Sequence, residues 1–355
     1  MNVIHIFTTS DKNYGIPLCV MITSVLYNKS IADNIEFHVL DFGILYEDKA
    51  NINAVVNKYN AKVHYYEEHS LDLLNYNVLV EKLYKKYDVT SYINPNTFVR
   101  LLIWEQFPNL DKCLWLDADL VVNQSLANLW AVDVTNTLFA GVLDLCIFED
   151  FEDVIDTDSI SYVKLCKQQK NIYMNAGVLL LNLQELRKLG SLKDILNNLY
   201  NYIDANNIKL TYYDQDILNI ICKENIIELP IHYNLVNWYF NKQCTQYNSE
   251  DLQTARANIQ TSGILHYTGS NKPWLFKSKI IYKPFFQVYW FYLSLTPYKK
   301  LKHLYAYKAS LHRVISRFAN KNTKKIKWLK LIILLPFSPI LFILYLFSSY
   351  KIINT

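Results

Sequence analysis

Short apolar runs typical of β-strands alternate with amphipathic stretches typical of α-helices along the first two thirds of the chain. Strands buried on both faces of a parallel sheet form continuous apolar runs, and each crossover between them needs a helix. The alternation therefore predicts an α/β fold built on a doubly wound sheet with right-handed crossovers. The expected strands are 3–8, 35–40, 62–66, 113–117, 138–143 and 176–183, and the expected helices are 17–28, 46–59, 95–106, 184–203 and 213–222.

The 355 residues carry a net charge of +4 that is unevenly distributed. Residues 252–355 contain 17 Lys or Arg and no Asp or Glu, whereas residues 1–251 contain 19 basic and 32 acidic residues. A nucleic-acid-binding protein would be basic over its body, so no nucleic-acid partner is expected. The basic end borders the most apolar stretch of the chain, which favours an anionic membrane surface as the partner.

The length suits one large core with a C-terminal appendage. The six cysteines show no Cys-x-x-Cys spacing and lie in apolar segments, as the reduced core thiols of a cytosolic protein do. The N-terminus lacks a basic region followed by a long apolar stretch, so no signal peptide is expected.

The character of the sequence changes near residue 284, and we expect three parts: a catalytic domain over 1–283, a basic and aromatic helical region over 284–330, and an apolar tail over 331–355. The middle part has the pattern of an interfacial helix. Residues 331–350 carry no charge and would span about 30 Å as a helix, although Pro336 and Pro339 argue against a straight one. A kinked span, a re-entrant wedge, a membrane-lying segment and a helix packed on the body all remain open. The lysines that precede residues 331–350 predict that the protein lies at the cytoplasmic face of the inner membrane.

Two aspartates, Asp117 and Asp119, follow the apolar run that ends at Leu116. Open α/β sheets bind ligands at the carboxyl ends of their strands. Two carboxylates one residue apart at such an end can hold one hard divalent cation together with phosphate oxygens. The motif is a candidate metal and diphosphate site, and the alternative is a solvated strand end.

A second segment, residues 264–274, begins as a short strand and breaks into a polar turn. It contains a possible metal ligand in His266, a flexible glycine in Gly269 and a cation in Lys272. An imidazole can complete a ligand set with two carboxylates, a glycine lets backbone N–H groups approach phosphate, and lysine supplies a point charge. The alternative for His266 is a hydrogen-bonded core or turn histidine.

Together with the N-terminal strand that runs into Thr8-Thr9-Ser10-Asp11-Lys12-Asn13-Tyr14, these two segments resemble glycosyltransferase family 8 over about residues 1–290. The resemblance implies a Rossmann-like GT-A fold and a retaining enzyme that uses a nucleotide-diphosphate sugar. Bacterial members that build lipopolysaccharide or other surface glycans are most similar. UDP-glucose or UDP-galactose is the implied donor, and a glycolipid or oligosaccharide is the implied acceptor.

The resemblance also assigns roles to residues of this sequence. It implies that Asp117, Asp119 and His266 coordinate Mn²⁺ or Mg²⁺, with Ala118 beside the donor and Gly269 and Lys272 on the diphosphate oxygens. The implied nucleotide contacts are Thr9, Asp11 and Asn13, although Asp11 could instead cap a helix before Pro17. A common second aspartate after Asp11 is Lys12 here.

The donor sugar is implied to contact Arg100, which also lies on the diphosphate side, and Asp214. Asn175, with Ala176 beside it, is a candidate contact to sugar hydroxyls, and Asp144, at the end of the strand 138–143, is a candidate contact to the acceptor or the sugar. For Arg100 the alternative is a structural salt bridge, and for Asp214 it is a helix N-cap. Gln215 is implied to lie beside the reacting anomeric carbon. Because glutamine is a poor nucleophile, we expect front-face transfer in which the leaving phosphate takes the acceptor proton. Asp216 is the candidate nucleophile for a covalent route.

Two other functions fit parts of the sequence. A haloacid-dehalogenase-type phosphohydrolase also places an aspartate pair after a strand, but near its N-terminus, and it leaves 264–274 unexplained. A non-catalytic membrane-bound scaffold would have no need of four complementary charges at Asp117, Asp119, His266 and Lys272.

Overall fold

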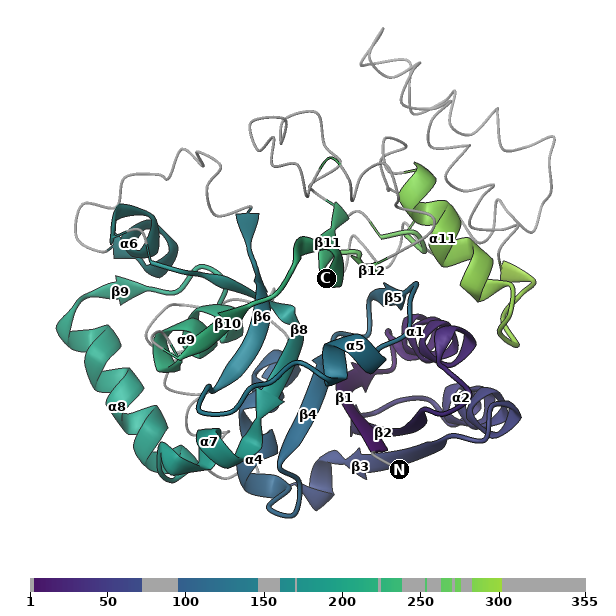
Figure 1. Cartoon of the computed structure of the whole chain (residues 1–355), viewed down its shortest axis with the longest axis horizontal. Helices are drawn as coiled ribbons and strands as arrows, with labels where there is room; N and C mark the ends of the chain where they lie inside the picture. The colour runs from purple at the N-terminus through teal and green to yellow at the C-terminus, as the bar shows by residue number, and fades with distance from the viewer. Residues whose placement is uncertain are drawn as a thin grey trace, which may run out of the picture.

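The computed structural model describes residues 3–71, 95–145, 160–169, 171–222, 225–237, 253, 263–269, 272–275 and 283–301. A seven-stranded sheet with the order β10-β6-β8-β4-β1-β2-β3 forms its centre (Figure 1). The strands of this sheet are β1 (Val3–Asp11), β2 (Asn34–Phe42), β3 (Lys62–Glu67), β4 (Lys112–Leu116), β6 (Phe139–Leu143), β8 (Met174–Asn182) and β10 (Ile226–Glu228).

Most neighbouring strands of this sheet are parallel, as the alternation of apolar runs predicted. The pairs β1–β2, β1–β4, β2–β3 and β6–β10 are parallel. The exception is β8, which runs antiparallel to both of its neighbours, β4 and β6. All nine residues of β8 are buried, so its sequence shows the continuous apolar run of a central strand and gives no sign of its direction.

Alternate residues of the strands supply two separate cores on the two faces of the sheet. Phe7 and Trp115 belong to one cluster together with the helices α7 (Leu183–Lys188), α8 (Leu192–Ala205) and α9 (Asp214–Ile221). Ile6 and Leu114 belong to the other, together with α1 (Gly15–Asn28) and α2 (Tyr46–Lys58). The period of two along each strand produces this separation.

The single helix predicted over 184–203 is two helices, α7 and α8. The chain breaks between them at Gly190, whose φ of +112° lies outside the range of a right-handed helix. Ser191 then caps α8, because its side chain accepts a hydrogen bond from the backbone N–H of Asp194 at 3.2 Å.

The shorter elements complete the described chain. They are the 3-10 helices η1 (Glu68–Ser70), η2 (Pro95–Leu102) and η4 (Ile231–Tyr233), the α-helices α4 (Ile103–Gln106), α5 (Ala127–Trp130) and α6 (Tyr162–Gln169), and the paired strands β7 (Ile160–Ser161) and β9 (Ile208–Lys209).

A second, three-stranded sheet brings distant segments to the end of β4. Its order is β11-β12-β5, with β5 at Leu120–Val122, β11 at Leu235–Val236 and β12 at Ile264–His266. β12 is antiparallel to β5, and His266 lies opposite Leu120. Because β5 begins directly after Asp119, this pairing places His266 beside the two aspartates.

The aromatic helix expected to begin near Pro284 is α11 (Lys283–Leu293). It lies alongside α1 and β5 (Figure 1). Its buried side chains share a third core cluster with Val121, Leu265 and Tyr267. Residues 302–330 of the predicted interfacial region and the whole apolar tail, 331–355, lie outside the described residues. Within the described part of the chain, no helix has the length and apolar character required to cross a membrane.

Candidate active site

The turn that carries Asp117 and Asp119 is held by backbone hydrogen bonds to both sheets. The Asp117 N–H donates to the Gly177 carbonyl at 3.0 Å, and the Asp119 carbonyl accepts from the Tyr267 N–H at 3.1 Å. Ala118, between the two aspartates, is buried. The two carboxylates therefore leave the end of β4 from a fixed backbone.

Three potential metal ligands converge at this turn. His266 Nε2 lies 3.7 Å from Asp117 Oδ2 and 3.4 Å from Asp119 Oδ1. One ligand atom from each of the three residues lies within 4.8 Å of the other two. Two carboxylates and an imidazole suit a divalent ion such as Mn²⁺ or Mg²⁺, so the residues present fit the predicted metal.

A hydrogen bond on the far side of the ring fixes the orientation of His266. His266 Nδ1 lies 3.0 Å from Asn234 Oδ1. The Asn234 amide is itself oriented, because its Nδ2 donates to Asn175 Oδ1 at 2.8 Å. An amide oxygen can only accept, so Nδ1 carries a proton and Nε2 is the nitrogen that faces the carboxylates. This is the orientation that a metal ligand requires.

Gly177 makes room for the His266 ring. A Cβ placed on Gly177 would lie 2.2 Å from His266 Cε1, a distance that no real contact allows. The glycine in β8 is therefore required by close packing against the candidate metal ligand.

Lys272 lies on the other side of Asp119. Its ammonium forms an ion pair with Asp119 Oδ2 and donates to the Tyr267 carbonyl. Burial raises the pKa of the Asp119 carboxyl, but Lys272 and His266 outweigh burial and hold that pKa well below its usual range. The rings of Tyr14 and Trp274 flank the ammonium, with centroids 5.9 and 5.7 Å from Nζ.

Arg100 joins the aspartate turn to the start of α9. It is buried, and its Nη2 lies 3.2 Å from Asp117 Oδ1 and 3.1 Å from Asp214 Oδ2, while Nη1 donates to the Ala176 carbonyl. The guanidinium stacks over the Trp115 ring, with its carbon 4.7 Å from the centroid. Burial raises the pKa of Asp214 to about 6, although Arg100 opposes the shift. The salt bridge considered as the alternative is present, and both of its partners are site residues.

Gln215 belongs to a buried network with three other candidate residues. Its Nε2 donates to Asp144 Oδ2 at 3.0 Å, and its Oε1 accepts from the Ala176 N–H at 3.0 Å. Asn175 Nδ2 also donates to Asp144 Oδ2 at 3.0 Å. The network brings β6, β8 and α9 together beside the metal ligands.

Asp216 is fully buried one residue beyond Gln215, and both of its oxygens are bonded. Tyr173 donates to Oδ1, and the N–H groups of Thr211 and Tyr212 donate to Oδ2 at 2.6 and 2.8 Å. Tyr213, directly before α9, has a φ of +39°, a strained conformation for a tyrosine. The carboxylate thus anchors the turn that presents Asp214 and Gln215.

The predicted nucleotide contacts lie at the carboxyl end of β1. Thr9 donates its hydroxyl to the Leu40 carbonyl at 3.0 Å, and Asp11 Oδ1 accepts from the Asn13 N–H at 2.7 Å. The helix alternative for Asp11 is not seen, because α1 begins at Gly15 and no side chain among the described residues caps it. Gly269, in the turn after β12, has a φ of +64°, which favours glycine.

Three residues of the site were missed by the sequence interpretation. Asn234 orients His266, Trp115 donates its Nε1–H to Asp117 Oδ1 at 2.7 Å, and Tyr14 flanks Lys272. Trp115 is two residues before Asp117 and so lies near it in any strand, a signal that was available. Asn234 reaches the site only through the pairing of β11 with β12, which no local pattern indicates.

A mostly parallel sheet flanked by helices, with two carboxylates, an imidazole and a lysine gathered beside the carboxyl end of β4, is typical of glycosyltransferases with the GT-A fold. The sequence profile of Glycosyl transferase family 8 matches residues 5–278, and the chain belongs to that family. This membership confirms the resemblance seen in the sequence, and it decides for a glycosyltransferase over the phosphohydrolase that was considered as an alternative.

Individual relatives agree with this assignment. The chain is 28% identical over 269 residues to the lipopolysaccharide 1,2-glucosyltransferase of Escherichia coli, which covers 74% of this chain and 71% of the relative. It is 23% identical to general stress protein A of Bacillus subtilis, over 84% of this chain and 96% of the relative. Among solved structures, the galactosyltransferase LgtC with donor and acceptor sugar analogues has a TM-score of 0.58 at 24% identity, covering 77% of this chain and 90% of that one. This last likeness confirms the GT-A fold.

Proposed function

We propose that this glycosyltransferase is a metal-dependent, retaining enzyme that moves glucose or galactose from a UDP-sugar to a hydroxyl of a cell-surface glycan. The convergence of Asp117, Asp119 and His266, with Lys272 beside them, carries the proposal. A lipopolysaccharide or lipooligosaccharide acceptor is supported by the relative named as a lipopolysaccharide glucosyltransferase.

Asp117, Asp119 and His266 would hold Mn²⁺ or Mg²⁺. The ion would supply positive charge to the departing diphosphate. The protein adds fixed cations of its own, since Lys272 ion-pairs with Asp119 and Arg100 lies against Asp117. Exchange of the Lys272 ammonium from Asp119 to a diphosphate oxygen would leave that carboxylate free for the metal.

The buried network around Gln215 would position the donor sugar. Asp144, Asn175 and Gln215 are linked by side-chain hydrogen bonds, and each is a type of group that recognises hydroxyls. Asp214 lies at the same edge, held by Arg100. These four residues would orient the anomeric carbon toward the acceptor.

Front-face transfer is the route that the site favours. Asp216 would have to give up hydrogen bonds from Tyr173, Thr211 and Tyr212 to attack the sugar. Leaving those donors unpaired in the interior would be costly. In the front-face route the leaving phosphate takes the proton of the acceptor hydroxyl, and no residue needs to act as a nucleophile. A glycosyl adduct trapped on Asp216 would contradict this choice.

The proposal is tested by UDP release from UDP-glucose and UDP-galactose, with and without Mn²⁺ and EDTA. We expect release that EDTA abolishes and that Asp119→Asn reduces at least about a hundredfold. Asp133→Asn, which changes an exposed aspartate outside the site, should leave the rate unchanged. UDP release that does not require a metal, or no UDP release with any donor in a wider panel, would contradict the proposal. Mass detection of products on a purified glycolipid identifies the sugar and the acceptor class.

We also propose that residues 302–355 attach the enzyme to the cytoplasmic face of the inner membrane. The support is compositional, because these residues combine basic side chains with 20 uncharged positions over 331–350. Each lysine near an anionic leaflet contributes on the order of 1 kcal/mol.

A further inference from the structure

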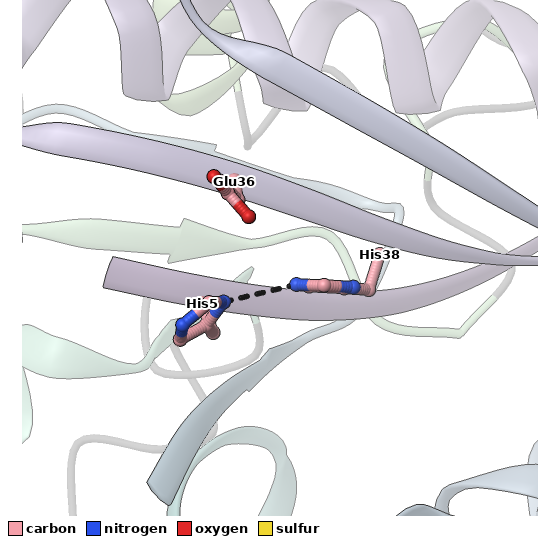
Figure 2. Close-up of side chains that lie close together, drawn as sticks. All are labelled: His5, Glu36 and His38. Carbon is pink, nitrogen blue, oxygen red and sulfur yellow. Dashed lines mark hydrogen bonds between the residues drawn. The ribbon is translucent and has the colours of Figure 1, made fainter. Parts of the chain in front are cut away.

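A second cluster of metal-ligand side chains lies on the other half of the main sheet. In the register of β1 and β2, His5 is opposite Glu36, and His38 is opposite Phe7. His38 is in turn opposite His64 on β3. Since residues two apart on a strand share a face, His5, Glu36, His38 and His64 all project from the same side of the sheet. Figure 2 shows the first three side chains together.

The donor atoms of this cluster are close enough to share an ion. His5 Nδ1 lies 3.0 Å from His38 Nε2, the contact drawn as a dashed line in Figure 2. One ligand atom each from His5, Glu36 and His38 lies within 4.8 Å of the other two. Two nitrogens bound to one tetrahedral Zn²⁺ lie about 3.3 Å apart, given Zn–N bonds of about 2.0–2.1 Å. The distance between the two nitrogens is therefore close to the distance expected for two ligands of one ion.

The environment of the two rings also suits metal binding. In the metal-free protein the contact between His5 Nδ1 and His38 Nε2 is a hydrogen bond, so one of these two nitrogens carries a proton. The same ring can carry that proton on its other nitrogen, and both facing lone pairs are then available to a metal ion. His38 Nδ1 lies 3.0 Å from the Tyr66 hydroxyl, which orients the ring from its far side.

The Glu36 carboxylate forms an ion pair with a lysine whose ammonium a metal ion could displace at little cost. Lys62 Nζ lies 2.6 Å from Glu36 Oε1, but the lysine side chain is 69% exposed. An exposed ion pair of this kind stabilises a protein by at most about 1 kcal/mol, so an ion that replaced the ammonium would lose little. Glu36 Oε2 lies 3.6 Å from His64 Nε2, which places a fourth nitrogen within reach of a small side-chain movement.

We propose that His5, Glu36 and His38 form a binding site for a transition-metal ion of the Zn²⁺ class, separate from the catalytic metal site. Two imidazoles and one carboxylate favour Zn²⁺, Co²⁺, Ni²⁺ or Cu²⁺, whereas Mg²⁺ and Mn²⁺ prefer oxygen-rich sites. The fourth position is filled by water or by His64. Along β1, Asp11 at the catalytic edge lies six positions beyond His5, a distance of about 20 Å.

Such an ion would link β1 to β2, and also to β3 where His64 supplies the fourth ligand. It would bind the folded chain and not the unfolded one, so it would raise the thermal stability in proportion to its affinity. The inference depends only on these strands and holds whatever the sugar donor is.

The test uses the full-length protein carrying Asp119→Asn, which weakens the catalytic metal site. After removal of metals with a chelator, the protein is titrated with Zn²⁺, and with Co²⁺ as a visible-absorption probe. We expect one tight Zn²⁺ site, a Co²⁺ spectrum typical of four-coordinate nitrogen and oxygen ligands, and a higher melting temperature with Zn²⁺.

Adding His5→Gln or Glu36→Gln should weaken Zn²⁺ binding at least tenfold, and adding Lys62→Gln should strengthen it. His69→Gln serves as the matched control, because it removes a histidine of η1 whose side chain is 81% exposed, and it should leave Zn²⁺ binding unchanged. Far-UV circular dichroism confirms that each variant is folded. Zn²⁺ affinity that neither His5→Gln nor Glu36→Gln reduces, or the absence of a tight site in the Asp119→Asn protein, would overturn the proposal.

Discussion

Each ligand of the candidate metal site is positioned by a neighbour that is not itself a ligand. Asn234 sets the tautomer of His266, Trp115 and Arg100 hold Asp117, and Lys272 holds Asp119. Outer contacts of this kind determine how well a metal site is preorganised. Small changes beside the ligands should therefore affect metal affinity strongly.

Gly177→Ala is the sharpest test of this packing. Because the added methyl would lie 2.2 Å from His266 Cε1, the ring has to move out of line with the two carboxylates. We expect Mn²⁺ affinity to fall at least about tenfold, with a loss of stability of about 1–3 kcal/mol. Mn²⁺ titration and thermal unfolding measure the two effects.

Gly190→Ala is the control for the same substitution at another glycine. Gly190 has a φ of +112° with no heavy atom near the added Cβ, so this variant should lose about 1–3 kcal/mol of stability from backbone strain alone. Its Mn²⁺ affinity should match that of the wild type. Equal metal affinity in both variants would refute the proposed contact between Gly177 and His266.

The position of a site residue could be predicted from the sequence where the residue directly follows its own strand. It could not be predicted where the position depends on the pairing of distant strands. Asp117 and Asp119 follow directly on β4, so their place at its carboxyl end was predictable. The role of Asn234 was not, because it depends on a parallel pairing between β11 and β12, which are about thirty residues apart. The need for a glycine at position 177 was not predictable from its own strand, because the neighbour that requires it is a side chain from β12.

At the scale of elements, the start of α9 combines a strained tyrosine with a buried acid. Burial raises the pKa of Asp216 to about 6, against about 3.9 in an unfolded chain. Between these values the folded state holds a proton that the unfolded state has released. The contribution of Asp216 to the free energy of unfolding therefore decreases as the pH rises from about 4 to about 6, by roughly 2–3 kcal/mol.

Urea unfolding of wild type and Asp216→Asn across this pH range checks the prediction. The stability difference between the two proteins should change with pH in the direction given, because Asn cannot titrate. Groups that do not interact with Asp216, such as Asp119 with its lowered pKa, contribute equally to both proteins and cancel. A stability difference that is constant from pH 4 to 6 would contradict the raised pKa.

One tyrosine of helix α11 makes two side-chain hydrogen bonds to the body of the enzyme. The Tyr292 hydroxyl accepts a hydrogen bond from Asn28 Nδ2 at 2.7 Å and donates to Asn123 Oδ1. Tyr292→Phe should therefore destabilise the protein by about 1–3 kcal/mol without changing Mn²⁺ affinity. Tyr46→Phe, at a side chain that is 88% exposed, is the matched control in thermal unfolding. Equal melting temperatures for the two variants would show that these bonds do not stabilise the helix.

Most elements of the main sheet were predictable from apolar runs, but two features of the topology were not. The direction of β8 depends on its partners, and the division of α7 from α8 depends on Gly190 and the Ser191 cap. The glycine and the serine were a readable stop and start signal. The strand direction has no local signal, since a central antiparallel strand and a central parallel one are equally apolar.

At the scale of the whole molecule, an acidic body precedes a basic and apolar C-terminal region. This division predicts that membrane attachment and catalysis are separable. Deletion of residues 324–355 should move the protein from the membrane pellet to the supernatant while activity on a soluble acceptor is retained. Sedimentation with vesicles that contain anionic lipid, compared with neutral vesicles, measures the attachment. Persistence of the truncated protein in the pellet would refute the anchor.

In the proposed function, one divalent ion for the departing diphosphate is held jointly by Asp117 and Asp119, which follow β4, and by His266 in β12. Anomalous diffraction at the manganese edge from crystals grown with Mn²⁺ and UDP tests it most directly. We expect one anomalous peak bounded by these three side chains, with the diphosphate oxygens on its open side and Lys272 beside them. A peak elsewhere, or bound UDP with the three side chains turned away from a common point, would contradict it.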